Sequence, residues 1–518
     1  MCVQTWRWER ADTFLCAGLA LLGLATRALL RANGLTTLDS GLLAVAVVDY
    51  DFVEVRPHPP YYPLTVALGK WMASAVGPVD ALSWLSVLAT GVLVAATYAV
   101  ARHVVGRVAA VGAALLVVAS PMALANGTAP LSYALEGAAS AVVALAALRA
   151  RRIPGPANWA ALGLFASIAV GIRPSSLFLL APLAMWGAGL RLRALAWTAG
   201  TGIAATVAWL LPAVVAGGGL DPFLFGLSVQ SRVFILSNPV WVGGWAAVQD
   251  NLAHLVLYVR FEGLFLVAVA LAGTVASAAV VPRLRDAPSG FFAAWALPAV
   301  AFYSLVYAGW PVFPDGYLLA LIPAAAVGCA RLLEAIVAAV REPIVPRAAQ
   351  MGGVVAVAAL CVLPAFWLGD WDDALALQND AEAWSDSWSG METVLLPNET
   401  ALLVFYGSPW IELEHPDYLA WHLQPFSPAP GVWQIQVAQS RGLQFDKSAL
   451  ENLRDGPDPP HPIPSGIRQI VLFQGHPLDG GYRLVRDGIS VLPVVLPSGA
   501  TVSVVATEGV ATLEELLP

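Results

Sequence analysis

Long apolar segments constrain this chain more than any other feature of its sequence. The hydrocarbon core of a bilayer needs about 20 apolar residues per helix. Only 12% of the residues are charged and 58% are hydrophobic, whereas soluble proteins carry about 25% charged residues. The chain therefore needs lipid as part of its solvent. Apolar windows of the required size predict eleven membrane spans, at 12–31, 82–101, 107–125, 131–149, 158–172, 175–190, 194–216, 261–281, 290–308, 316–338 and 349–368.

The charges divide the chain into two parts. Residues 369–518 carry 20 acidic and 6 basic side chains, whereas residues 1–368 carry 15 acidic and 21 basic ones. We therefore expect a transmembrane domain over 1–368, with long outer loops at 32–81 and 217–260, and a soluble domain over 369–518. No basic stripe runs along the chain, so a nucleic-acid partner is not expected.

Loop charge gives the predicted spans an orientation. With the N-terminus in the cytoplasm, the cytoplasmic loops and span ends hold 14 basic residues. The opposite side, without the tail, holds seven, although its loops are much longer. This asymmetry agrees with the positive-inside rule. We expect an integral protein of a prokaryotic plasma membrane, with the C-terminal domain outside the cytoplasm.

The acidic tail has the pattern of a small α/β or mostly β domain. Apolar runs at 401–406, 468–473 and 488–495 are separated by Pro/Gly-rich segments, which is typical of strands. A short helix is expected near 415–422. None of the four cysteines lies in the tail, so it has no disulfide framework. The expected fold is thus an all-α polytopic membrane domain followed by a small C-terminal extracytoplasmic α/β domain.

The first outer loop concentrates polar residues close to the membrane. Asp39 lies about eight residues after the first predicted span, and a short helix in the membrane interface is expected within 38–50. A carboxylate held there can take the proton of an acceptor hydroxyl. An Asp before an apolar helix can also serve only as its N-cap. His58 can be purely structural, and Asp49 and Asp51 can be solvated loop charges.

This loop resembles the first outer loop of the GT-C glycosyltransferases, and more closely that of bacterial and archaeal relatives of the protein O-mannosyltransferases (the glycosyltransferase family 39 type). Asp39 matches the acidic position after the first span. The segment from His58 to Leu64 matches a His-Pro-Pro-Gly-Tyr-Pro-Leu-like pattern. Tyr61 stands where that pattern has Gly, and Ser40 stands where many members have a second acid.

Shorter stretches elsewhere resemble the same family. Ser132–Glu136 is similar to its region between the third and fourth spans. Gly171–Ser175 is similar to its small-basic-Pro turn. The segment 315–317 resembles a late helix that often reads Arg-Tyr, but Gly316 replaces the Arg. Glu136, predicted just inside the fourth span, is either a functional acid or a helix-packing residue.

The resemblance implies an inverting transfer of a sugar from a polyprenyl-phosphate donor to a hydroxyl of a glycan, lipid or protein. Asp39 would be the catalytic base, and the enzyme would be of the hexosyl- or mannosyltransferase type. His58 and Tyr61 would contact substrate. No metal or other cofactor is expected.

Three arginines near the outer side are candidates for binding the lipid phosphate. Arg173 lies at an outer turn, and Arg232 and Arg260 lie in or near the second long outer loop. Guanidinium groups suit phosphate because they form charge-assisted, bidentate hydrogen bonds. Each could instead pair with a nearby acid, such as Asp250 or Glu262, or reach for lipid headgroups.

Two other classes of protein remain as alternatives. A transporter or flippase of lipid-linked sugars would show repeated halves and polar groups at mid-membrane, whereas here no repeat is found and the acids cluster near the surface. An assembly protein acting through its acidic tail would not need Asp39 and the His-Pro-Pro segment in one loop.

Overall fold

The computed structural model describes residues 8–52, 56–58, 60–189, 191–224, 227, 239–261, 289–307, 316–339, 389–405, 417–429, 432–440, 462–473 and 489–516. The chain forms two compact units. The first comprises Met1–Ala32 and Pro59–Gln378, and the second comprises Asn33–His58 and Asn379–Pro518. The predicted boundary at 368/369 lies outside the described residues and stays a prediction. Part of the first predicted outer loop belongs to the same unit as the tail.

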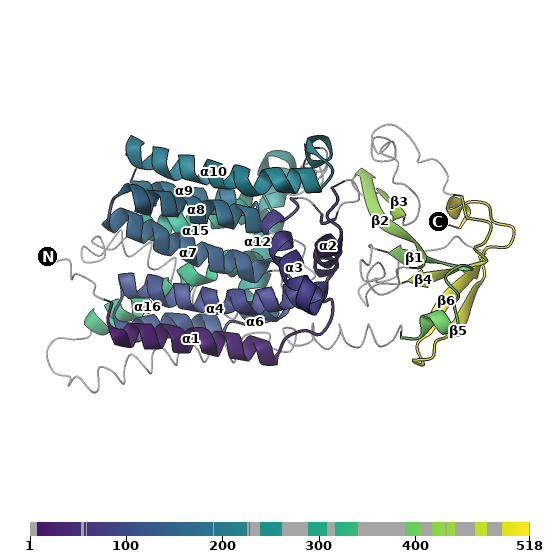
Figure 1. Cartoon of the computed structure of the whole chain (residues 1–518), viewed down its shortest axis with the longest axis horizontal. Coiled ribbons are helices and arrows are strands. Elements are labelled where there is room, and N and C mark those ends of the chain that lie inside the picture. The colour runs from purple at the N-terminus through teal and green to yellow at the C-terminus, as the bar shows by residue number, and fades with distance from the viewer. Residues whose placement is uncertain are drawn as a thin grey trace. The chain divides into compact units, whose positions relative to one another are not determined.

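The first unit is a bundle of apolar helices. Figure 1 shows α7, α8, α9 and α10 running side by side. The described elements are α1 (Arg10–Leu29), α3 (Pro63–Val76), α4 (Pro78–Val104), α5 (Arg107–Val118), α6 (Pro121–Thr128), α7 (Tyr133–Arg152), α8 (Pro156–Ile172), α9 (Ser176–Ala188), α10 (Leu192–Ala216), α12 (Val240–Phe261), α15 (Ser289–Leu305), the 3-10 turn η1 (Gly316–Ala320) and α16 (Ile322–Ala339).

Most of the predicted spans coincide with these helices, and those at 261–281 and 349–368 lie outside the described residues. Four described helices, α1, α4, α7 and α10, are long and apolar enough to cross a membrane alone. The bent pair α5 and α6 would make a fifth span. The remaining apolar helices are shorter, so the count of eleven is not established by this part of the chain.

The predicted span at 107–125 is broken. Helices α5 and α6 meet at an angle of 57°. Ser120 has an extended backbone (φ −74°, ψ 121°) and its side chain caps α6, while Pro121 is the first helical residue. Proline disfavours the helical conformation in the residue before it, which explains the break. Helices α3 and α12 also form inside the two stretches that were predicted as outer loops.

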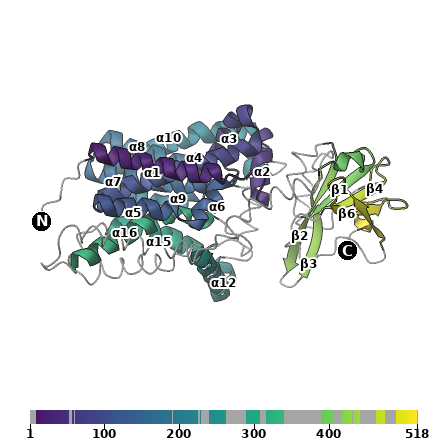
Figure 2. The same ribbon diagram turned by 90° about the horizontal axis from the view of Figure 1, so that it is seen from below.

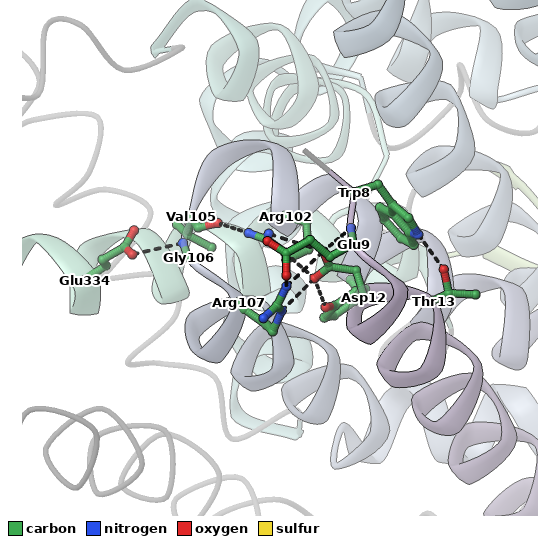
Figure 3. A network of polar contacts seen from close by, with 10 residues as sticks. Trp8, Glu9, Asp12, Thr13, Arg102, Val105, Gly106, Arg107 and Glu334 are labelled. Carbon is green, nitrogen blue, oxygen red and sulfur yellow. Dashed lines mark hydrogen bonds and ion pairs between the residues drawn. The ribbon is translucent and has the colours of Figure 1, made fainter. Parts of the chain in front are cut away.

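Charged side chains fix α1 against α4 at both ends. Figure 3 shows the fully buried carboxylate of Asp12 accepting hydrogen bonds from Nε of Arg102 (2.8 Å) and Nε of Arg107 (2.9 Å). At the opposite end of the two helices, Arg31 pairs with Asp80. Asp12 lies in the first turn of α1 and Arg102 in the last turn of α4, where the helix dipoles favour each charge. The pairs therefore set α1 antiparallel to α4.

The second unit contains a mixed six-stranded sheet, visible in Figure 2. The strand order is β3-β2-β1-β4-β6-β5. Central β1 is parallel to β2 and β4, and the other pairings are antiparallel. The strands are β1 (Thr400–Phe405), β2 (Leu419–Ala429), β3 (Val432–Ser440), β4 (Gln469–Phe473), β5 (Val491–Val495) and β6 (Thr501–Ala506). The strands predicted at 401–406, 468–473 and 488–495 are confirmed as β1, β4 and β5.

The helix expected near 415–422 is wrong, because this segment enters strand β2. Its side chains alternate between the two faces of the sheet. Tyr418 and Ala420 belong to one apolar core, whereas Trp421 belongs to the other, with Leu419 packed against it. A period of two places successive side chains on opposite faces of a strand. Because both faces of this strand are buried, its sequence lacks the alternation of apolar and polar residues that would have predicted a strand.

Candidate functional site

The acidic residue of the first loop lies at the start of helix α2 (Leu38–Val48), in the second unit. Thr37 is the N-cap: its hydroxyl accepts a hydrogen bond from the backbone N–H of Ser40 (3.2 Å). The Ser40 hydroxyl accepts in turn from the backbone N–H of Thr37 (2.9 Å). Asp39 is the second helical residue, so the interpretation of Asp39 as the N-cap is wrong. Its carboxylate is available for another role.

His58 lies beside Asp39. Nδ1 of His58 is 3.8 Å from Oδ1 of Asp39, and the two side chains are 21% and 39% exposed. This separation is an ion-pair distance when the imidazole is protonated and exceeds that of a hydrogen bond. The backbones of Asp51 and Arg56 exchange two hydrogen bonds, which turns the loop back toward α2. Arg56 also pairs with Asp49 (2.8 Å), so Asp49 already has a partner.

Tyr61 has a backbone conformation that is typical of glycine. Tyr61 has φ +73° and Tyr62 has φ +44°, in the left-handed region that costs a non-glycine residue roughly 1–2 kcal/mol. Tyr61 is fully buried in the first unit, and its ring lies 5.6 Å from that of Phe223 between centroids. Burial raises the pKa of the Tyr61 phenol, so it stays neutral at physiological pH. The buried ring offsets the backbone strain.

Arg173 is buried in the first unit and has a carboxylate partner. Its Nε lies 3.2 Å from Oε2 of Glu136, which is fully buried. Nη1 of Arg173 donates to the hydroxyl of Ser132 (3.1 Å). The other carboxylate oxygen of Glu136 accepts from the hydroxyls of Ser175 (3.2 Å) and Ser176 (3.0 Å). Glu136 thus joins α7 to the segment between α8 and α9, and this geometry favours its interpretation as a helix-packing residue.

Aromatic rings surround the same guanidinium. Its carbon lies 4.0 Å from the ring centroid of Tyr133, 5.1 Å from that of Tyr317 and 5.5 Å from that of Tyr62, all within cation–π range. We call these three tyrosines with Arg173 and Glu136 the Arg173 cluster. A Cβ on Gly316 would stand 2.4 Å from Cβ of Tyr133, which explains why no arginine fits at that position.

The Arg173 cluster brings together motifs that are far apart in the sequence. The stretches 132–136, 171–175 and 315–317 each contribute at least one member, and Tyr62 comes from the His58–Leu64 segment. The hydroxyl of Thr65 in α3 donates to the carbonyl of Ile172, the last residue of α8 (3.0 Å), which holds the start of α3 against the end of α8 next to Arg173. The roles of Tyr62 and Ser132 were missed, because only the tertiary contact identifies them.

The other predicted binding residues are less fully described. Arg232 lies outside the described residues, and of Arg260 only the backbone, in α12, is described. Asp39 and His58 belong to the second unit, whereas Tyr61 and Arg173 belong to the first. In the described part of the chain, no three His, Cys, Asp or Glu side chains gather as metal ligands. Metal independence stays a prediction.

Solved structures share this fold although no sequence match was found. No protein-family model matches the chain, and no curated protein matches it. ArnT from Cupriavidus metallidurans bound to undecaprenyl phosphate superposes with a TM-score of 0.54 and 14% identity, over 97% of this chain and 99% of that one. Its apo structure gives 0.55 and 16%, over 95% and 97%. The chain thus has the fold of ArnT, and four of its described helices are long and apolar enough to cross a membrane.

A weaker likeness is to the archaeal oligosaccharyltransferase AglB from Archaeoglobus fulgidus, in complex with an inhibitory peptide and a dolichol-phosphate. Its TM-score is 0.45 at 14% identity, over 78% of this chain and 63% of that one. The fold assignment rests on ArnT. The narrower resemblance to the protein O-mannosyltransferase type stays a prediction.

Substitutions of Tyr61 test whether its backbone is strained. Tyr61→Gly and Tyr61→Ala both remove the buried ring, but only glycine adopts φ +73° without steric cost. We expect the Gly variant to be more stable than the Ala variant by on the order of 1 kcal/mol. Unfolding of both purified proteins in detergent measures the difference. An Ala variant at least as stable as the Gly variant would contradict the strain.

Proposed function

We propose that the chain is an inverting glycosyltransferase that moves a sugar from a polyprenyl-phosphate donor to an acceptor hydroxyl at the outer face of the membrane. The observation that carries the proposal is the position and exposure of the Asp39 carboxylate. Asp39 lies in the first turn of the apolar helix α2, and its side chain is partly exposed. Thr37, and not Asp39, caps this helix. The GT-C fold over nearly the whole chain supports the same reaction.

In the proposed reaction Asp39 is the general base. It takes the proton of the acceptor hydroxyl as that oxygen attacks the anomeric carbon. The bond from the anomeric carbon to the phosphate oxygen breaks, and its electron pair leaves with the polyprenyl phosphate. Direct displacement inverts the anomeric centre. His58, 3.8 Å from Asp39, is proposed to orient the carboxylate and to contact substrate.

The leaving phosphate needs a cation to stabilise its charge. Arg173, Arg232 and Arg260 remain the proposed contacts. Arg173 already pairs with Glu136, so a phosphate would have to compete with a buried carboxylate for it. Arg232 and Arg260 are therefore the first candidates for the direct contact, and Arg173 and Tyr61 stay proposed as substrate-binding residues. No metal is required in this scheme.

The finer assignments rest on the sequence. The hexosyl or mannosyl type of the sugar follows only from the resemblance to the O-mannosyltransferases. A transporter or flippase is the alternative, but no observation on the described residues favours it. Transport would leave the bond between sugar and phosphate intact, so release of free polyprenyl phosphate separates the two functions.

Asp39→Asn is expected to abolish sugar transfer, because an amide cannot accept the proton. Loss of a positioned general base typically costs 10²–10⁴-fold in rate. The matched control is Asp49→Asn, which changes an acid of the same loop that is paired with Arg56 and should keep most of the activity. Purified variants are compared in a transfer assay with a labelled polyprenyl-phosphate sugar.

Two further measurements make the Asp39 result decisive. Binding of the lipid donor and the melting temperature should remain close to wild type in Asp39→Asn. Wild-type turnover by this variant, with Asp49→Asn inactive instead, would overturn the assignment of the base.

The proposed site requires a defined topology, with eleven spans, the N-terminus in the cytoplasm and the tail outside. Ser465 is exposed in the second unit. A cysteine introduced there, after the native cysteines are replaced by serine, should react with a membrane-impermeant reagent on intact cells. Labelling that appears only after lysis would reverse the orientation.

A further inference from the structure

The segment that leads into α2 is anchored in the core of the C-terminal sheet. Leu35 is partly buried and packs against the apolar cluster formed by Met391, Leu395, Leu402, Tyr418, Ala420, Val471, Leu496, Val502 and Val504. This cluster covers one face of the sheet, and we call it the sheet core. Leu35 lies about 360 residues before the sheet core in sequence, yet both belong to the second unit. The first loop thus packs against the sheet core through Leu35.

A short, tightly bonded turn connects this anchor to Asp39. The backbone N–H groups of Thr36 and Thr37 both donate to the hydroxyl of Ser40, at 3.0 and 2.9 Å. That hydroxyl donates to the carbonyl of Thr37 (2.6 Å). The backbone N–H of Gly41 donates to the same carbonyl (3.2 Å). Asp39 therefore lies between residues whose positions are fixed relative to Leu35.

From this connection we infer that the C-terminal sheet domain is a positioning element for the catalytic carboxylate. Leu35 transmits the position of the sheet core to the first turn of α2, and Ser40 makes that turn rigid. The inference deepens the proposed function and rests on it. Its physical basis is that a base must lie within about 3 Å of the proton it removes, and a displacement of 1 Å can cost about 100-fold in rate.

The buried hydroxyl of Ser40 has a specific role in this turn. A carboxylate at this position could not donate a proton to the Thr37 carbonyl when ionised, whereas the serine hydroxyl both donates and accepts. Ser40 is fully buried, so its hydrogen bonds do not compete with water. The residue is a positioning residue and does not touch substrate.

Truncation of Leu35 in the full-length protein tests the inference. Leu35→Ala should lower kcat for sugar transfer by about 10- to 100-fold, with little change in KM for the lipid donor. Leu35→Met, which nearly conserves volume, should restore most of the rate. The matched control is Val494→Ala, since Val494 packs against the same sheet core but is far from α2 in the chain.

A readout independent of activity separates this inference from the proposed function. Hydrogen exchange of the peptide that contains Ser40 and Gly41 should accelerate in Leu35→Ala and remain near wild type in Val494→Ala. Unchanged exchange and kcat in Leu35→Ala would overturn the inference, as would an equal loss in Val494→Ala. If hydrogen exchange is faster in Leu35→Ala but the wild-type protein transfers no sugar, the anchor is retained and the proposed function is rejected.

Discussion

A guanidinium that is buried in an apolar helix bundle needs an opposite charge and hydrogen-bond acceptors. Arg173 is such a group, and its partners come from several helix ends of the first unit. The cost of removing a charge from water is several kcal/mol unless a partner and hydrogen bonds compensate. Glu136 supplies the opposite charge, Ser132 accepts a hydrogen bond, and tyrosine rings face the cation. These partners come from α7, η1 and the turn before α3. A single buried charge therefore determines how several helix ends meet.

In the second unit, the carboxylate of Asp39 lies at the start of α2 but does not serve as the cap of that helix. At the start of α2 the backbone N–H groups need acceptors, and Thr37 and Ser40 provide them. Asp39 is left with only His58 as a described ionic neighbour, at 3.8 Å. Because Thr37 caps α2, the neighbouring Asp39 carboxylate can take part in the proposed chemistry.

Much of the fold followed from the sequence, because long apolar windows report directly on the solvent that surrounds a helix. The break at Pro121 was missed, since an average over a window does not register one residue that interrupts the backbone. Strand β2 was missed because Ala420 and Trp421 are buried on opposite faces of the sheet. Averaged hydropathy cannot distinguish such a strand from part of a buried helix.

The candidate site was predictable where a motif is local and not where it depends on tertiary contact. Asp39 and His58 were chosen from one loop, and the structure places their side chains together. The pairing of Arg173 with Glu136 joins residues from two helices and could not be read from their spacing. Likewise, charge and composition placed residues 33–58 with the membrane domain, but Leu35 packs against the sheet core.

Inverting sugar transfer from a lipid-linked donor is measured most simply with the purified wild-type protein in liposomes, supplied with a panel of labelled polyprenyl-phosphate sugars and candidate acceptors. We expect that one donor loses its sugar, that free polyprenyl phosphate appears in equal amount, and that the product has the inverted anomeric configuration. Transfer with retention, or sugar that crosses the bilayer still attached to its lipid, would contradict this expectation.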